Sequence, residues 1–312
     1  MEKDYTILIT GGAGFLGSYI IKNLKKKRYE NLLIPRSKDY DLRNIEVCRQ
    51  LTKRSDIVIH LAANVGGIGY NQQFPATLFY DNSLLGLNML HASYETGIKK
   101  FVALGTVCAY PKYTPVPFRE ENLWEGYPEE TNAPYGLAKK MLLVGCQAYR
   151  KQYNFNGIYL LPVNLYGPGD NFNPGESHVI PALVRKFYEA KLNKQNHVLV
   201  WGTGEASREF LYVQDAAEAI VMAMEKYNKS SPINLGSGQD ITIRALAAKI
   251  ASILNYHGRI VWDKTKPDGQ PKRLLNVDKA KNEFGFKAKT DFDTGLNKTI
   301  NWFIKKYGKS LS

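Results

Sequence analysis

The chain has 312 residues, of which 44% are hydrophobic and 23% are charged, and it carries a formal net charge of +13 at pH 7. This composition is typical of a folded globular protein and excludes disordered, collagen-like and coiled-coil chains. The positive charges are dispersed, no apolar run reaches the roughly 18 residues of a membrane span, and only three cysteines are present, so we expect a cytoplasmic protein that binds neither nucleic acid nor membrane and holds no metal.

Short apolar runs rich in β-branched residues alternate with amphipathic stretches. The runs predict strands at residues 5–10, 32–34, 57–60, 101–104, 158–161 and 233–235. The stretches between most of them predict helices, for example over residues 15–28. Because buried parallel strands read as nearly continuous apolar runs, the alternation indicates a doubly wound α/β fold, a parallel Rossmann sheet of at least five strands with helices on both faces.

A glycine-rich turn follows the first strand. Its three spaced glycines have GxxGxxG spacing, which differs by one residue from the GxGxxG fingerprint. Such glycines let the chain turn tightly and let the backbone approach a pyrophosphate at the N-terminus of the next helix. A purely structural turn is the alternative, but the order of strand, turn and helix favours a dinucleotide site. This site would comprise Gly11, Gly12, Ala13, Gly14, Phe15, Leu16 and Gly17.

The end of the second strand indicates which dinucleotide binds. An acidic residue there would bind a ribose 2′-hydroxyl, whereas a cation would pair with a 2′-phosphate. Arg36, helped by Ser37 and Lys38, therefore favours NADP(H), unless these residues form only an exposed basic loop. Asp41 and Leu42 are candidates for contact with the adenine.

The third strand is followed by Leu61, Ala62 and Ala63. The small side chains there would let a nucleotide lie close to the backbone. His60 precedes them. We interpret it as a buried histidine with satisfied hydrogen bonds, because no second histidine or acid lies at metal-ligand spacing.

Tyr135 and Lys139 lie four residues apart in a predicted helix, so both project from one face. An adjacent ammonium stabilises a phenolate, and we expect Lys139 to lower the pKa of Tyr135 toward the range useful for acid–base catalysis. The fourth strand ends at Leu104 and Gly105, which we expect to contact the cofactor. The following Thr106 offers a hydroxyl to a substrate carbonyl. This spacing alone is common on helix surfaces, but the glycine turn and Thr106 favour a catalytic interpretation.

The character of the chain changes near residue 171, where segments rich in Pro and Gly begin. Helices are predicted over residues 180–190, 215–227 and 243–254. We expect a dinucleotide-binding domain over residues 1–170 and a smaller α/β substrate lobe over residues 171–312. The segment around residues 213–238 is expected to return to the first domain, which would make the lobe discontinuous.

The glycine turn, the Thr106 hydroxyl and the tyrosine–lysine pair together resemble the extended short-chain dehydrogenase/reductase family, whose members carry a C-terminal lobe for nucleotide sugars. Within that family, the chain is most similar to enzymes that epimerise and reduce GDP-4-keto-6-deoxy sugars. The similarity lies at residues 63–68, 104–112, 164–168, 170–172, 177–183, 201–202, 208–211 and 266–269. It implies an NADP(H)-dependent 3,5-epimerisation and 4-reduction of a GDP-4-keto-6-deoxy-hexose.

The resemblance also implies roles for single residues. Cys108 and His178 match the pair that moves protons at C3 and C5, with the thiol or thiolate as base and the imidazole as acid. A buried thiol and a histidine at a helix N-terminus are the alternatives. Tyr135 would then protonate the 4-keto oxygen, while Lys139 would hold the nicotinamide ribose. Positions matching nicotinamide contacts are Pro162, Asn164, Leu165 and His178, and those matching substrate contacts are Asn164, Lys186, Trp201, Arg208 and Asp268.

Four residues depart from the family pattern. Thr106 stands where Ser is usual, and Val107 replaces a second hydroxyl residue. Asn64 replaces a Lys, and Lys186 replaces an Arg, which exchanges a bidentate fork for a point charge. These departures leave open a 4-reductase or epimerase of another nucleotide sugar, such as a GDP-4-keto-6-deoxy-heptose. A non-catalytic dinucleotide-sensing protein is a further alternative, which the intact catalytic set disfavours.

Two apolar helical stretches bear on the oligomeric state. The helix that carries Tyr135 continues through residues 141–144, and a second apolar helix is predicted over residues 84–94. Members of the family that the chain resembles pair these helices in a four-helix dimer interface, so the resemblance implies a homodimer. The alternative is that both helices only cover the sheet.

Overall fold

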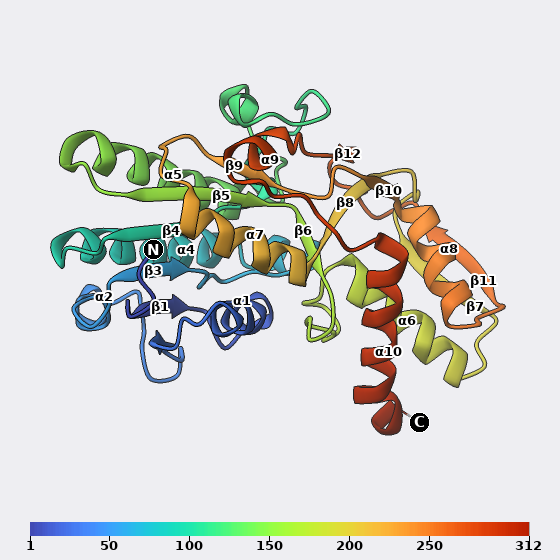
Figure 1. The fold of residues 1–312 in the computed structure, drawn as a ribbon. Helices are drawn as coiled ribbons and strands as arrows, with labels where there is room; N and C mark the ends of the chain where they lie inside the picture. Colours follow the sequence, from blue (N-terminus) through green and yellow to red (C-terminus); the bar gives the residue numbers. More distant parts are fainter. Residues whose placement is uncertain (312) are drawn as a thin grey trace.

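The larger lobe is built around one parallel sheet. The computed structural model describes residues 1–311, and within them six strands pair in the order β2-β1-β3-β4-β5-β9 (Figure 1). Their bounds are Leu32–Leu33 (β2), Ile7–Thr10 (β1), Ile57–His60 (β3), Lys100–Leu104 (β4), Gly157–Pro162 (β5) and Ile233–Leu235 (β9). Every residue of β1, β3, β4, β5 and β9 is buried, as a sheet covered on both faces requires. The predicted doubly wound α/β fold is confirmed.

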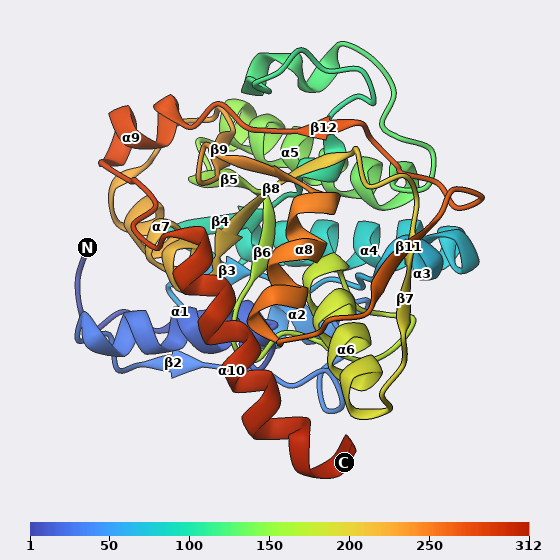
Figure 2. The same ribbon diagram turned by 90° about the vertical axis from the view of Figure 1, so that its right-hand side faces the viewer.

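Helices cover both faces of this sheet (Figure 2). On one side α1 packs against α7, which also contacts α9, and on the other side α2, α4 and α5 pack in that order. Their bounds are Phe15–Lys26 (α1), Val213–Lys226 (α7), Asp278–Phe284 (α9), Ile45–Thr52 (α2), Pro75–Glu95 (α4) and Ala133–Tyr153 (α5). The carboxyl ends of the parallel strands therefore meet at one edge, where doubly wound folds bind their ligands.

A smaller lobe stands beyond that edge, on the right in Figure 1. In it β6, β10 and β12 pair with β8, and β11 pairs with β7. Its elements are β6 (Asn164–Tyr166), α6 (Val179–Leu192), β7 (His197–Trp201), β8 (Ser207–Tyr212), β10 (Asp240–Thr242), α8 (Ile243–Ile253), β11 (Arg259–Asp263), β12 (Lys272–Arg273) and α10 (Phe292–Leu311). Phe187, Leu246 and Phe303 belong to a hydrophobic cluster separate from that of the large sheet.

The chain passes between the two lobes more than once. It leaves the large sheet after β5 and enters the smaller lobe through β6. It comes back through α7, which packs on α1, and through β9, in which Ile233 pairs with Leu160 of β5. The domain boundary at residue 170 stays a prediction.

Some elements differ from the sequence predictions. Helix α4 begins at Pro75 rather than at residue 84. Proline is tolerated in the first turn of a helix, because the N–H that it lacks would have no partner within the helix there. Helix α1 ends at Lys26, before the left-handed Arg28 with φ of 64°. The sequence patterns did not indicate α3 (Ile68–Gln73) or most strands of the smaller lobe, which are only two to six residues long.

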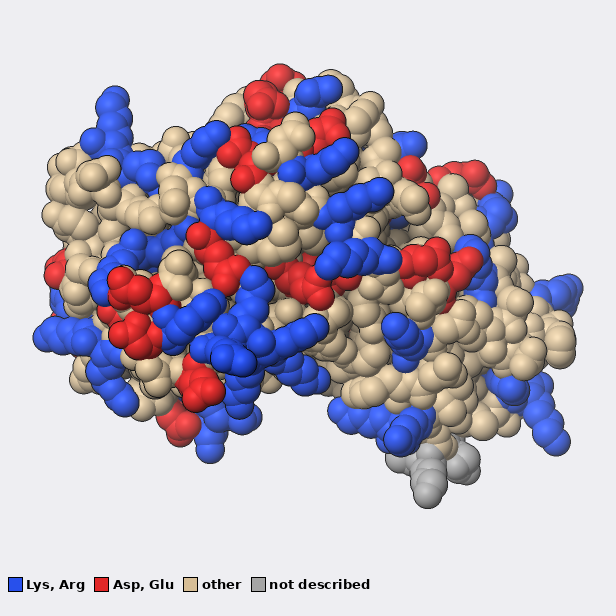
Figure 3. All heavy atoms as spheres, in the orientation of Figure 1, with Lys and Arg blue, Asp and Glu red and all other residues tan. Residues whose placement is uncertain are grey.

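Charged side chains are spread over the surface. Figure 3 shows Lys and Arg across the whole of one face, with Asp and Glu between them. In the part of the chain that the structure describes, none of the helices has the length and apolar character that crossing a membrane requires.

Candidate active site

The glycine turn between β1 and α1 is shaped for an anion. Gly11 adopts φ of +70°, and an ideal Cβ there would lie 2.9 Å from the Ala62 nitrogen, so the turn touches the end of β3. A Cβ at Gly17 would lie 2.5 Å from the Gly11 carbonyl oxygen. Gly14 caps α1 without any side-chain hydrogen bond, which leaves the N–H groups of the first turn available. These features fit the pyrophosphate of a dinucleotide.

The other residues predicted to contact the cofactor follow the same edge of the sheet. Ala13 is exposed in the turn, and Phe15 and Leu16 begin α1; Leu61, Ala62 and Ala63 follow β3; Leu104 and Gly105 lie at the end of β4; Pro162 ends β5; and Asn164 and Leu165 lie in β6. The Asn164 amide donates to the Glu209 carbonyl (3.0 Å), which joins this edge to β8 of the smaller lobe.

The closeness of Gly17 to the turn gives a first prediction. In Gly17→Ala the new methyl would lie 2.5 Å from backbone atoms of Gly11 and Gly12, so the turn must open. We expect a loss of about 1–3 kcal/mol in the free energy of unfolding and weaker NADPH binding, measured by denaturant unfolding and by titration of nicotinamide fluorescence. Gly69→Ala is the control, because nothing lies within 4 Å of a Cβ at that position. Unchanged NADPH affinity in Gly17→Ala would contradict the assignment of the glycine turn as the pyrophosphate site.

The residues predicted to read the 2′-phosphate lie just after β2. Arg36, Ser37 and Lys38 are all exposed, and the Arg36 carbonyl accepts the Tyr40 N–H in a turn (3.0 Å). Their charged and hydroxyl groups are thus accessible to an anion beside the second strand. This placement fits a cofactor that carries a 2′-phosphate.

The two adenine candidates differ from each other. The Asp41 carboxylate is exposed and pairs with Arg43 (2.9 Å), which also reaches Asp81 (3.1 Å). The side chain of Leu42 is buried in the hydrophobic core, and its carbonyl already accepts hydrogen bonds from the Cys48 thiol (3.2 Å) and the Asn88 amide (3.3 Å). Sequence reasoning did not single out Arg43.

A close helix contact brings the predicted catalytic side chains together. An ideal Cβ at Gly136 would lie 2.5 Å from the Cys108 carbonyl oxygen, so α5 packs directly on the 3₁₀ turn η1 (Val107–Ala109). The side chains of Thr106 and Tyr135 are hydrogen-bonded, and the charge of a Cys108 thiolate would be felt at the phenol. Three of the predicted catalytic groups therefore meet at the carboxyl end of β4.

The pKa of Tyr135 is opposite to the sequence expectation. Burial raises it well above its usual value, the neighbouring Cys108 acts in the same direction, and the hydrogen bond from Thr106 only partly opposes them. The Lys139 ammonium lies 5.9 Å from the centre of the Tyr135 ring. The expectation that this pKa is lowered is wrong, because desolvation of the buried phenolate is the largest influence on it.

Lys139 is itself only 3% exposed, and burial lowers its pKa to about 8. The charged amine is therefore less stable in the folded protein than in the unfolded chain. We expect Lys139→Met to raise the free energy of unfolding at pH 7, by up to about 3 kcal/mol at 1.36 kcal/mol per pKa unit.

The pH dependence tests the cause. Between pH 8 and the ordinary lysine pKa of 10.5, the unfolded chain binds a proton at Lys139 that the folded protein does not. Wild-type stability should therefore rise with pH through this interval relative to Lys139→Met, and denaturant unfolding at both ends of the interval measures it. A constant difference between the two proteins would rule out the buried charge as its cause.

His178 is linked to the catalytic group through Arg273, which donates to the Cys108 Sγ and whose charge acts on the His178 ring. It precedes α6 as its N-cap, and its loop is joined to the loop after β3 by the Gly67 N–H, which donates to the Glu176 carbonyl (3.1 Å). The residue is exposed to solvent in part, but protein atoms crowd around its ring. This crowding lowers its pKa, and the positive charge of Arg273 adds to the effect.

Arg273 is a functional candidate that sequence reasoning missed. Its Nη1 donates to the Cys108 Sγ (3.5 Å), and its charge also acts on His178. Arg273 lies in β12, which is two residues long. The one nearby indication in the sequence was the segment at residues 266–269, which resembles the family.

Arg208 and Asp268 lie together beside this group. Arg208 donates from Nη2 to the Asp268 carbonyl (2.8 Å), and burial and the charge of Arg273 lower its pKa to about 9. The Asp268 carboxylate accepts the backbone N–H and the hydroxyl of Thr203 (2.8 and 2.7 Å). Asp268 thus has one hydrogen bond on each carboxylate oxygen before any ligand binds.

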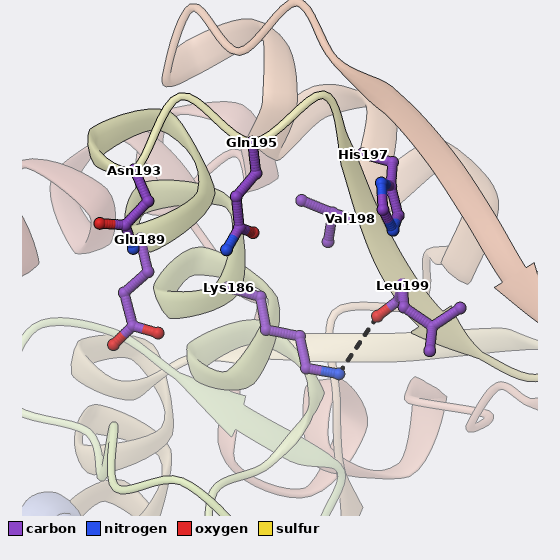
Figure 4. Close-up of a pocket in the computed structure, with 7 residues that line it drawn as sticks. All are labelled: Lys186, Glu189, Asn193, Gln195, His197, Val198 and Leu199. Atoms are coloured by element: carbon purple, nitrogen blue, oxygen red, sulfur yellow. Dashed lines mark hydrogen bonds between the residues drawn. The ribbon is translucent and has the colours of Figure 1, made fainter.

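Lys186 and Trp201 lie farther out, between α6 and β7. The Lys186 Nζ donates to the Leu199 carbonyl (3.3 Å; Figure 4). The same Nζ stands 5.7 Å from the centre of the Trp201 ring. Lys266 stands over the same ring at 5.3 Å. A surface cavity of about 310 Å³ opens here, lined by Lys186, Glu189, Asn193, Gln195, His197, Val198 and Leu199. Its lining does not include the catalytic candidates.

His60 is buried at the end of β3, as predicted. Its Nδ1 is hydrogen-bonded to the Thr10 hydroxyl (2.9 Å), whereas its Nε2 has no partner among the described residues. Burial and the charge of Lys139 lower its pKa to about 3, so the ring is neutral. The prediction that both ring nitrogens are hydrogen-bonded therefore holds for Nδ1 but not for Nε2.

Known proteins are similar to this chain over nearly its whole length. The model of the NAD-dependent epimerase/dehydratase family matches residues 7–236. The chain belongs to this family. The chain is 40% identical to GDP-L-fucose synthase 1 of Arabidopsis thaliana over 306 residues, which cover 97% of this chain and 94% of that protein.

Solved structures of similar proteins agree with this assignment. A GDP-L-fucose synthetase from Naegleria fowleri bound to NADP is 32% identical, with a TM-score of 0.89 over 100% of this chain and 98% of that one. A GDP-6-OMe-4-keto-L-xylo-heptose reductase from C. jejuni is 28% identical, with a TM-score of 0.93 over 98% and 99%. The epimerase/dehydratase match ends before Asp268 and Arg273, which complete the site from the smaller lobe.

Proposed function

We propose that this chain is an NADPH-dependent enzyme that epimerises C3 and C5 and reduces C4 of a GDP-4-keto-6-deoxy-hexose, the activity of a GDP-L-fucose synthase. The observation that carries the proposal is the meeting of Thr106, Tyr135 and Cys108 at the end of β4. His178 is linked to this group through Arg273, which donates to the Cys108 Sγ and whose charge acts on the imidazole. A hydroxyl and a phenol there can hold one carbonyl oxygen, and a thiol lies beside them.

Epimerisation requires proton removal from one face of the sugar and proton return on the other. The Cys108 thiolate takes the proton from C3 or C5, and the C–H electron pair moves into an enolate whose charge rests on O4. Hydrogen bonds from Thr106 and Tyr135 stabilise that oxygen. Protonated His178 then returns a proton to the opposite face, and solvent restores both groups.

Reduction follows at the same carbonyl. NADPH, when bound, supplies a hydride to C4. Tyr135 gives its phenolic proton to O4, and the raised pKa keeps that proton in place at neutral pH until it is needed. Lys139 holds the nicotinamide ribose from the same face of α5, and Thr106 polarises the ketone.

The rest of the substrate would extend toward the smaller lobe. Arg208 and Lys186 supply the positive charge that a diphosphate needs, and Trp201 offers a flat apolar surface between two lysines. Asp268 and Asn164 would meet sugar or ribose hydroxyls.

A second candidate is a 4-reductase of a GDP-4-keto-6-deoxy-heptose. The structure that favours it is the heptose reductase with a TM-score of 0.93. Lys186, a point charge where the family carries an arginine, is also compatible with a different sugar.

One assay distinguishes the candidates. The protein is mixed with NADPH and either GDP-4-keto-6-deoxy-D-mannose or a GDP-4-keto-6-deoxy-heptose, the absorbance of NADPH is followed, and the product sugar is identified. Oxidation with the hexose and a product inverted at C3 and C5 supports the proposal. Oxidation with the heptose alone supports the second candidate, and no oxidation with either sugar rejects both.

We also infer a cytoplasmic homodimer. Phe79 and Tyr80 of α4 and Met141 and Val144 of α5 are exposed large apolar residues, and Ser83 joins the two helices through the Met141 sulfur (3.9 Å). Two copies of this face would bury it in a four-helix contact.

The dimer prediction has a direct test. Val144 is 48% exposed, so Val144→Glu should fold but place a carboxylate in the interface and convert the dimer to a monomer, as measured by light scattering after size exclusion. Val261→Glu on β11, where the wild-type residue is 40% exposed, is the matched control and should leave the mass unchanged. A monomeric wild-type protein would reject the inference.

A further inference from the structure

Arg273 is an unusual charge for the interior of a protein. Its side chain lies in the smaller lobe and is 7% exposed. Across residues 1–311 its guanidinium forms no ion pair with a carboxylate; it donates from Nε to the Gln270 Oε1 (2.9 Å) and from Nη1 to the Cys108 Sγ (3.5 Å). Buried charges are normally paired, because removing an ion from water without a counter-charge is costly. Of its two hydrogen-bond partners, only the Cys108 thiol can become an anion.

The neighbouring buried arginine shows the contrast. Arg208 lies opposite Arg273 in the β8–β12 pairing and also feels Cys108, but the negative charges of Asp268 and Glu129 act on it as well. It therefore has opposite charges nearby that do not depend on the thiol.

Gln270 holds Arg273 in place relative to Cys108. It is buried, and its amide Nε2 donates to the carbonyls of Pro111 and Lys112 (3.0 Å each). These two residues follow Cys108 in the same loop. A single side chain therefore fixes the guanidinium from the smaller lobe against the segment of the larger lobe that carries the sulfur.

The position of Arg273 also suits the partner of the thiol. Its positive charge disfavours the charged form of His178, so an imidazolium there gives up its proton more readily. The guanidinium that donates to the Cys108 sulfur (3.5 Å) thus also makes an imidazolium at His178 a stronger acid, and it makes that protonated form less populated.

We propose that Arg273 is a positioning residue of the epimerisation: it is the hydrogen-bond donor and counter-ion of the Cys108 thiolate, and Gln270 holds it there. In proton abstraction the sulfur lone pair forms the S–H bond, the C–H pair moves to the enolate, and Arg273 makes and breaks no covalent bond. The inference rests on the proposed function for its catalytic meaning, but the pairing of Arg273 with the thiolate can be tested without substrate.

The test compares the alkylation of Cys108 by iodoacetamide at pH 7 in wild type, Arg273→Lys and Arg273→Met, with site occupancy read by peptide mass spectrometry. Because the thiolate is the reactive form, we expect a rate at least about tenfold lower in Arg273→Met and an intermediate rate in Arg273→Lys, which keeps the charge but loses the fork. Arg259→Met, at an exposed position of β11, is the matched control and should react like wild type. Cys48 and Cys146 are buried and serve as internal blanks.

The direction of the change separates this role from a structural one. Loosening the site would expose the sulfur and speed alkylation, so a wild-type or faster rate in Arg273→Met overturns the proposal. If that variant does not fold, Gln270→Met takes its place: a rate several-fold below wild type supports the proposal, and an unchanged rate overturns it.

A second readout keeps the two proposals distinct. Incorporation of solvent deuterium at C3 and C5 of GDP-4-keto-6-deoxy-D-mannose should fall at least about tenfold in Arg273→Met and recover in part in Arg273→Lys. Absence of incorporation in wild type would reject the epimerase function and leave the alkylation result standing. Wild-type incorporation in Arg273→Met would reject the role of Arg273 in the reaction.

Discussion

Replacing Tyr135 by Phe is expected to lower the rate of NADPH oxidation with GDP-4-keto-6-deoxy-D-mannose by about 10²–10⁴-fold, the usual contribution of a positioned general acid. The phenol is hydrogen-bonded to the Thr106 side chain at the proposed ketone site. Phe keeps the ring and its packing on α5, so the loss should fall on kcat. NADPH absorbance in single-turnover experiments measures the effect on the hydride step itself.

Two controls make this result specific. Tyr127→Phe removes a hydroxyl at a 63% exposed position and should keep the wild-type rate. NADPH affinity of Tyr135→Phe should remain close to that of wild type, because the glycine turn is untouched. A Tyr135→Phe enzyme that oxidises NADPH within a few-fold of the wild-type rate would show that another group protonates O4.

Much of the larger lobe could be predicted because its signals are local. The strands around Ile9, Ile59 and Val102 are apolar throughout, since both faces of a parallel sheet are buried. The glycine turn and the spacing of Tyr135 and Lys139 are short patterns whose geometry follows from strand and helix periods. Their meeting at one edge follows from the parallel order of the strands.

The pKa of Tyr135 could not be predicted in the same way. Its spacing from Lys139 is visible in the sequence, but the burial of the phenol depends on how closely α5 packs on η1. That approach requires Gly136, whose purpose becomes clear only when the Cys108 carbonyl is seen beside it. Burial then decides the direction of the shift.

Arg273 could not be predicted because its contacts are distant in sequence. It is separated from Cys108 by 165 residues, and a two-residue strand paired with β8 brings it there. No periodic pattern marks so short a strand. Gln270, which anchors it, looks like an ordinary loop residue until its hydrogen bonds to Pro111 and Lys112 are known.

Cys108→Ser is expected to separate the two halves of the reaction. A serine hydroxyl at the same place is a far weaker base than a thiolate, so solvent deuterium incorporation at C3 and C5 should fall by at least about 10²-fold. Thr106, Tyr135 and Lys139 remain in place, so hydride transfer should continue on the ketone that has not been epimerised. Proton NMR of the product in deuterated buffer measures both outcomes in one sample.

The product would therefore identify the base. If Cys108 alone removes these protons, the Cys108→Ser product keeps the substrate configuration at C3 and C5 and carries no deuterium there. Cys146→Ala removes a thiol buried in the core and should give the wild-type product. Deuterium at the wild-type level in Cys108→Ser would assign proton removal to another group. His178 is the next candidate, because Arg273 disfavours its charged form and so leaves the neutral imidazole populated.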